Sequence, residues 1–115
     1  MTTSTRLLTS ALVAGLGAVA YARWESERFT LRRATVRALT TPQPDMRVLH
    51  LSDLHLVPGQ TTKKAWVSSL VELRPDAVIA TGDFLSHRDA IGEVVEALEP
   101  LFDIPGAFVL GSNDY

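Results

Sequence analysis

Residues 46–60 read MRVLHLSDLHLVPGQ, and this stretch decides the fold. Its first six residues form an apolar run of strand length, and the polar residues 52–55 (SDLH) follow that run directly. Pro58 and Gly59 then signal a turn. A short apolar run that ends in polar residues and a turn predicts a buried strand at the start of a strand–helix unit.

The residues that follow repeat this pattern. Apolar residues four apart within residues 62–73 predict a helix that ends before Pro75, and residues 77–80 (AVIA) predict a second strand. The spacing i, i+3, i+4, i+7 within residues 91–98 predicts a second helix, and residues 107–110 (AFVL) predict a third strand. We therefore expect an α/β fold of the order β-α-β-α-β, with a parallel sheet buried on both faces.

Upstream, residues 7–22 (LLTSALVAGLGAVAYA) are uncharged, with Arg6 before them and Arg23 and Trp24 after them. This pattern is typical of an N-terminal membrane segment. The run is shorter than the roughly 20 residues that span a bilayer, so an uncleaved signal anchor and a cleaved signal peptide with small residues at 18–20 both remain open. We favour the anchor over cleavage and over a buried core helix. More arginines follow the run than precede it, which favours the cytoplasmic face for the rest of the chain.

Between the apolar run and the first unit, residues 29–39 (FTLRRATVRAL) contain two short alternations of apolar residues. They predict another strand, with a bulge near Arg33 where the alternation slips. The prolines within residues 40–45 predict a loop. The expected organisation is an anchor or signal peptide over residues 1–24 and a folded domain over residues 29–115.

The composition limits the functional classes. The chain has 115 residues, a formal net charge of −2 and no cysteine. This length allows one small domain. The charge balance lacks the basic excess of a nucleic-acid-binding protein, so we expect no nucleic-acid partner. Without cysteine, neither a disulfide framework nor a thiolate metal site is possible.

Each predicted strand ends in side chains that can bind metal. Because the carboxyl ends of parallel strands lie along one edge of a sheet, about 4.8 Å apart, these side chains can reach one site. Carboxylate, imidazole and amide ligands suit manganese, iron or zinc better than copper. Glycine at positions 82 and 111 would let the backbone turn beside the site. The candidate metal ligands are Asp53, His55, Asp83 and Asn113.

These strand ends resemble a known family. The sequences LSDLHL (residues 51–56), ATGDFL (residues 80–85) and VLGSNDY (residues 109–115) resemble the motifs D-x-H, G-D and G-N-H-D/E of calcineurin-like metallophosphoesterases. With the N-terminal apolar run, the chain resembles the bacterial membrane-linked branch of that family. The resemblance implies the N-terminal half of a four-layer α/β sandwich, preceded by an apolar helix, in a chain that is a fragment.

The resemblance also implies a chemistry. It implies a site for two divalent metal ions, with Asp53 and His55 on one ion and Asp83 bridging both. The implied function is that of a metal-dependent phosphoesterase, which hydrolyses a phosphodiester, a phosphomonoester or a pyrophosphate. The substrate would be a phosphorylated small molecule or lipid. The alternative is a membrane-tethered, non-enzymatic relative with a degenerate metal site. The oligomeric state is not predicted.

The third motif departs from the family pattern. A gapless alignment of GSND with G-N-H-D puts Ser112 at the amide-ligand position and Asn113 at the catalytic histidine position. A shift by one residue makes Asn113 the ligand and puts Asp114 at the histidine position. Either way the general-acid histidine is missing, so no catalytic residue is predicted. Of the other histidines, His50 is expected in the core and His87 in solvent.

Overall fold

The computed structural model describes residues 3–39 and 43–115. The chain divides into two compact units, Met1–Arg33 and Ala34–Tyr115. The predicted loop over residues 40–45 lies partly outside the described residues, and residues 43–45 adopt neither helix nor strand.

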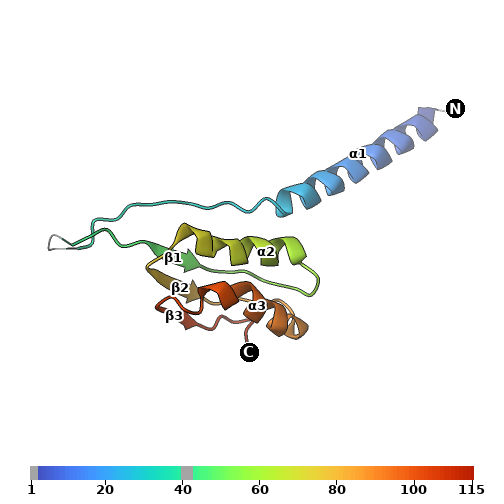
Figure 1. Ribbon diagram of the computed structural model, residues 1–115. Coiled ribbons are helices and arrows are strands. Elements are labelled where there is room, and N and C mark those ends of the chain that lie inside the picture. Colours follow the sequence, from blue (N-terminus) through green and yellow to red (C-terminus); the bar gives the residue numbers. More distant parts are fainter. Residues whose placement is uncertain (1–2, 40–42) are drawn as a thin grey trace. The chain divides into compact units, whose positions relative to one another are not determined.

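The first unit is built on the helix α1 (Thr3–Ser26), drawn in blue in Figure 1. Polar residues at both ends extend the helix beyond the apolar run to 24 residues, a length of about 36 Å. Among the described residues, one segment, Ser4–Ser26, is long and apolar enough to cross a membrane. Signal sequences and core helices can share this length and composition, so the helix is a candidate span.

Aromatic and basic residues gather at the C-terminal end of α1. The rings of Tyr21 and Trp24 lie 5.8 Å apart, and the Arg28 guanidinium lies 4.6 Å from the centre of the Trp24 ring. Arg23 pairs with Glu27 at 3.5 Å. Amphipathic aromatic rings beside basic residues are typical of the headgroup level of a bilayer.

The strand predicted over residues 29–39 is wrong. These residues, all of them described, adopt neither helix nor strand, and their apolar side chains remain accessible, with Leu31 39% and Val36 78% exposed. A strand needs a neighbouring strand to satisfy its backbone groups, whereas the three-stranded sheet consists of β1, β2 and β3 and does not include this segment. Its alternation of apolar residues therefore has no sheet face to fill.

The second unit has the predicted order β-α-β-α-β (Figure 1). Its strands form one parallel sheet in the order β1-β2-β3. The helices and strands are β1 (Val48–Leu51), α2 (Thr61–Ser69) with the 3-10 turn η1 (Leu70–Leu73), β2 (Ala77–Thr81), η2 (Arg88–Ala90), α3 (Ile91–Leu98), η3 (Glu99–Leu101) and β3 (Gly106–Val109). The α/β fold expected from the sequence is thus confirmed.

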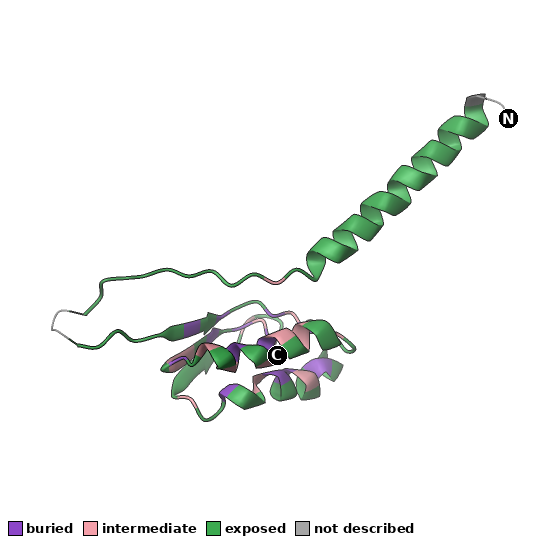
Figure 2. Ribbon diagram, turned by 45° about the horizontal axis from the view of Figure 1, so that its top comes forward, coloured by how far each residue is buried: buried purple, intermediate pink, exposed green. Residues whose placement is uncertain are grey.

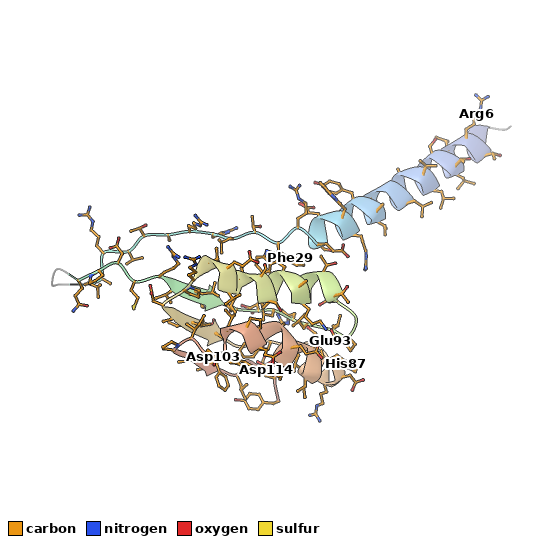
Figure 3. The ribbon with its side chains drawn as sticks, in the orientation of Figure 1. Arg6, Phe29, His87, Glu93, Asp103 and Asp114 are labelled. Atoms are coloured by element: carbon orange, nitrogen blue, oxygen red, sulfur yellow. The ribbon has the colours of Figure 1, made fainter. Side chains whose placement is uncertain are left out.

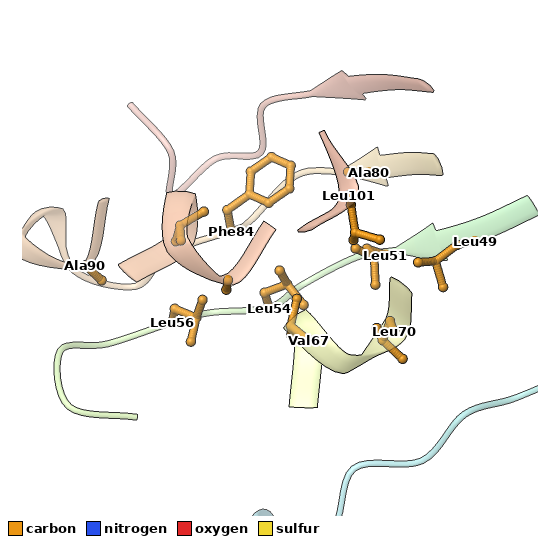
Figure 4. Packing of buried hydrophobic residues seen from close by; sticks show 12 residues of the cluster. Leu49, Leu51, Leu54, Leu56, Val67, Leu70, Ala80, Phe84, Ala90 and Leu101 are labelled. Carbon is orange, nitrogen blue, oxygen red and sulfur yellow. The ribbon is translucent and has the colours of Figure 1, made fainter. Parts of the chain in front are cut away.

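The core lies between one face of the sheet and the two helices (Figure 4). Side chains from the sheet, from the loops after β1 and β2, and from both helices form a single apolar cluster. Ser68 of α2 also donates a hydrogen bond to the Ala97 carbonyl of α3, at 3.1 Å. The buried members are Leu49, Leu51, Leu54, Leu56, Val67, Leu70, Ala80, Phe84, Ala90, Val94, Ala97 and Leu101.

The expectation that the sheet is buried on both faces is also wrong. The face opposite the core exposes apolar side chains, including Ile79 at 43% and Val109 at 60%. Figure 2 colours the ribbon by burial, and exposed and buried residues alternate along β1. Crossover connections of one hand between strands in sequential order place their helices on the same face, so α2 and α3 leave the other uncovered. His50 lies on this open face, where its Nε2 is 2.8 Å from the Thr81 hydroxyl, and not in the core.

Candidate metal centre

Three of the predicted ligands lie together beyond the carboxyl ends of β1 and β2. His55 Nε2 is 3.8 Å from Asp53 Oδ1 and 3.9 Å from Asp83 Oδ2. One ligand atom from each residue lies within 4.8 Å of the other two. The side chains of Asp53, His55 and Asp83 are 64%, 41% and 21% exposed, so the group is open to solvent on one side.

Backbone hydrogen bonds hold the two loops that carry this group. The Asp53 N–H donates to the Gly82 carbonyl at 3.1 Å, and the His55 N–H donates to the Asp83 carbonyl at 2.9 Å. The Leu56 N–H donates to the Phe84 carbonyl, also at 2.9 Å. The parallel pairing of β1 with β2 therefore continues past the strand ends, and this places the three side chains side by side.

The backbone of all three residues lies in the left-handed region. Their φ angles are 54° at Asp53, 45° at His55 and 50° at Asp83. Non-glycine residues rarely adopt these angles, and each such position costs of order 1–3 kcal/mol. Leu54, which lies between Asp53 and His55, is buried in the core, and its carbonyl accepts a hydrogen bond from Lys63 Nζ at 3.0 Å. Core packing thus holds the loop in a conformation that turns both neighbouring side chains outward.

The loop after β3 hydrogen-bonds to Asp83. The Asn113 N–H donates to Asp83 Oδ1 at 3.0 Å, and the Ser112 hydroxyl lies 3.5 Å from the same oxygen. The Asn113 N–H is the main reason that the pKa of the Asp83 carboxyl lies below its usual value, and the nearby His55 contributes. The carboxyl of Asp83 therefore stays ionised into more acidic solution than usual, as a metal ligand requires.

Asp114 has a structural role that the sequence did not reveal. Its Oδ1 accepts the N–H groups of Phe84 at 2.8 Å and Leu85 at 3.2 Å, and its Oδ2 accepts the Gly111 N–H at 2.8 Å. The carboxylate (Asp114 is labelled in Figure 3) therefore fastens the loop after β3 to the loop after β2. The sequence feature that could have indicated this role is the spacing of three residues between Gly111 and Asp114, which lets an aspartate accept the N–H of the glycine within one loop.

Two glycines allow these loops to approach. Gly82 has a φ of 78°, and a Cβ there would lie 2.5 Å from the Gly111 nitrogen. A Cβ on Gly111 would lie 2.1 Å from Asp83 Oδ1. Both separations are shorter than non-bonded contacts allow. The two loops can therefore approach only while position 82 lacks a side chain, and the carboxylate of Asp83 can occupy its place only while position 111 lacks one.

The remaining sequence candidates lie as follows. Asn113 is exposed beside Asp83, and its role as a metal ligand stays a prediction. His87 is exposed, as expected, and its Nδ1 accepts the Asp89 N–H at 3.2 Å at the start of η2. This bond ties His87 to its own turn.

Residues 46–115 match the family model described as calcineurin-like phosphoesterase. The chain belongs to the calcineurin-like phosphoesterase family. The match begins just before β1 and covers the whole sheet together with both loops of the candidate centre. The three-stranded unit is consistent with part of a metallophosphoesterase fold.

The chain is also similar to a curated protein from Rhodococcus erythropolis (strain PR4 / NBRC 100887). It is called a probable cyclic nucleotide phosphodiesterase and is 32% identical over 96 residues. The matched region covers 70% of this chain and 32% of the relative, so the chain spans about a third of the relative's length. No solved structure matches the chain.

The donor atoms of the centre fit the divalent metals that the family typically binds. A metal ion lies about 2.1 Å from nitrogen and oxygen ligands. The separations of 3.8 Å and 3.9 Å around His55 Nε2 are shorter than twice that distance, so one ion fits between the imidazole and either carboxylate oxygen. Two carboxylates and an imidazole are hard to borderline ligands, which agrees with this class of metal.

Proposed function

We propose that the protein is a metal-dependent phosphoesterase and that Asp53, His55 and Asp83 are metal ligands. The convergence of these side chains at one edge of the sheet, within 4.8 Å, carries the proposal. Membership of the phosphoesterase family supports the reaction class. We further propose that residues 29–115 are part of the phosphoesterase domain and that residues 1–24 are a membrane anchor.

Each candidate ligand has its own proposed role in metal binding. Asp53, His55 and Asp83 would hold two divalent ions, manganese, iron or zinc, and such ions would supply Lewis-acid activation of water and of the phosphoryl group. Asp53 and His55 would bind one ion, and the ionised carboxylate of Asp83 would be shared between both. The exposed sides of these residues leave room for substrate. The remaining ligands would come from the loop after β3, with Asn113 as the candidate, and from further residues of the intact protein.

The altered third motif bears on the rate of the reaction. The Asn113 side chain can donate a hydrogen bond to a phosphoryl oxygen, but an amide does not supply a proton to a leaving group. Asp114 already accepts three backbone N–H groups. Water would then protonate the leaving group, and we expect slow turnover. The alternative function, a membrane-tethered relative without catalysis, rests on the same substitution.

The substrate that we propose is a phosphodiester of a small molecule or lipid. The relative from Rhodococcus erythropolis is called a probable cyclic nucleotide phosphodiesterase, which supports a diester. The candidate span in α1 would tether the chain to a membrane, which makes a lipid substrate available. Phosphomonoesters and pyrophosphates carry the same phosphoryl group and serve as comparison substrates.

Hydrolysis of bis(p-nitrophenyl) phosphate with added Mn²⁺ tests the proposed reaction. We expect turnover by a protein that contains this chain and the residues that complete the family domain, and none by the 115-residue chain alone. Among the described residues, the candidate metal group offers three ligands, too few for two ions, and one face of the sheet is bare. Turnover by the 115-residue chain would contradict the ligand count. Inactivity of both proteins would favour the non-enzymatic alternative.

The anchor has its own expected outcome. The intact protein should sediment with membranes and resist carbonate extraction, because the exposed apolar residues of α1 favour lipid over water. Replacing Leu12 and Leu16 with arginine should move it to the soluble fraction, since each arginine costs about 2.5–3.5 kcal/mol at the centre of a span. Wild-type protein in the soluble fraction would contradict the anchor. A mature N-terminus near Tyr21 would indicate cleavage.

A further inference from the structure

Each of the three candidate ligands has two polar atoms, and in each the two atoms face different partners. The atoms that face one another are Asp53 Oδ1, His55 Nε2 and Asp83 Oδ2. The other atom of each residue meets a serine hydroxyl. These three contacts come from different loops and are made by Ser52, Ser86 and Ser112.

The contact at His55 is the most informative of the three. Ser86 Oγ lies 3.1 Å from His55 Nδ1. The Ser86 N–H donates to the Leu56 carbonyl at 2.9 Å, and Leu56 pairs with Leu85 in a parallel bridge. The backbone pairing beyond β1 and β2 therefore places the hydroxyl opposite the imidazole. If Nδ1–H donates to this oxygen, the unprotonated Nε2 faces the carboxylates, as metal binding requires.

The two carboxylates have corresponding contacts. The Ser52 hydroxyl donates to Asp53 Oδ2 and lies 3.5 Å from the Thr81 carbonyl. The Ser112 hydroxyl lies 3.5 Å from Asp83 Oδ1, which also accepts the Asn113 N–H at 3.0 Å. Because Asp83 has this second and shorter contact, its orientation depends less on the serine than that of Asp53 or His55.

We propose that Ser52, Ser86 and Ser112 are positioning residues that orient one metal ligand each. This proposal rests on the proposed metal function. Each of the three exposed serines would determine which atom of its ligand faces the ion. Outer hydrogen-bond partners of this kind typically raise metal affinity by about 10–100-fold. Ser86, the sole serine of the three that sets a tautomer, has the largest expected effect, and Ser112 has the smallest.

The test measures Mn²⁺ affinity of the intact protein by calorimetry and the neutral tautomer of His55 by ¹⁵N NMR without metal. Ser86→Ala should weaken Mn²⁺ binding about 10-fold and move the ring proton from Nδ1 to Nε2. Ser86→Thr, which keeps the hydroxyl, should restore both. The matched control is Ser69→Ala, since the exposed Ser69 hydroxyl donates a hydrogen bond within its own helix, to the Trp66 carbonyl at 2.7 Å.

The possible results separate the two proposals. Weaker binding with a changed tautomer in Ser86→Ala, and wild-type values in Ser69→Ala, would support the positioning role. Unchanged affinity in both Ser86→Ala and Ser52→Ala would overturn that role and leave the metal function intact. A wild-type protein that binds no Mn²⁺ would overturn both. Thermal unfolding without metal should be alike in all variants, and equal losses of stability and affinity would overturn the positioning role.

Discussion

Replacing Asp83 with asparagine should remove the bound divalent metal and all metal-dependent phosphodiester hydrolysis from the intact protein. Asp83 is the one candidate ligand whose carboxylate contacts both His55, at 3.9 Å, and the loop after β3. In the proposed centre Asp83 binds both ions. Its replacement should therefore lower metal affinity by more than the roughly 10–100-fold that follows the removal of an outer hydrogen-bond partner. Asp53→Ala should mainly weaken one ion. Elemental analysis of the purified proteins measures both effects.

Asparagine is chosen because it keeps the shape of the side chain and tolerates the left-handed backbone at this position, where φ is 50°. Asp83→Asn should therefore fold like the wild-type protein. Asp103→Asn is the matched control, because Asp103 is an exposed carboxylate in the turn after η3, outside the centre (Figure 3). Full metal occupancy in Asp83→Asn would rule out the assignment of Asp83 as the shared ligand.

Replacing Gly82 with alanine should destabilise the domain strongly. The new Cβ would lie 2.5 Å from the nitrogen and 2.7 Å from the Cα of Gly111, and these backbone atoms cannot move aside as a flexible side chain can. The φ of 78° adds a further penalty. Overpacking of about 1–3 kcal/mol and left-handed strain of about 1–2 kcal/mol together predict a loss of about 2–5 kcal/mol in the free energy of unfolding.

Gly92→Ala is the matched control for this substitution. Gly92 lies within α3, and a Cβ there meets nothing within 4 Å. Alanine should stabilise the helix by about 0.5–1 kcal/mol relative to glycine. Urea denaturation of the intact protein measures both free energies. A Gly82→Ala protein as stable as the wild type would mean that the loops after β2 and β3 do not approach as described.

The order of elements in the domain could be predicted from the sequence because each strand is a short apolar run and each helix has its own spacing. The strand predicted at residues 29–39 failed for a physical reason. Alternating side chains indicate a strand only where a partner strand and a sheet face exist, and neither is visible in a local pattern. The sheet is covered on a single face because of its strand order, and a local sequence pattern does not indicate the strand order.

The candidate centre was predictable in part. Polar residues at successive strand ends identified Asp53, His55 and Asp83, and the structure brings these three together. The contacts of Asp114 and of the serines could not be predicted, because they depend on how the loops cross. The left-handed backbone at the ligands was equally hidden, because aspartate and histidine adopt it more often than most residues but the sequence does not say which of them do.

That backbone conformation has a consequence for directed evolution of this domain. At Asp53, His55 and Asp83 the residues that best relieve a positive φ are glycine and asparagine, and neither replaces a charged or imidazole ligand. A screen that rewards heat resistance alone should therefore enrich glycine or asparagine at these three positions and return robust but inert proteins. Libraries for thermostability should hold the three codons constant and search elsewhere, for example at Gly92.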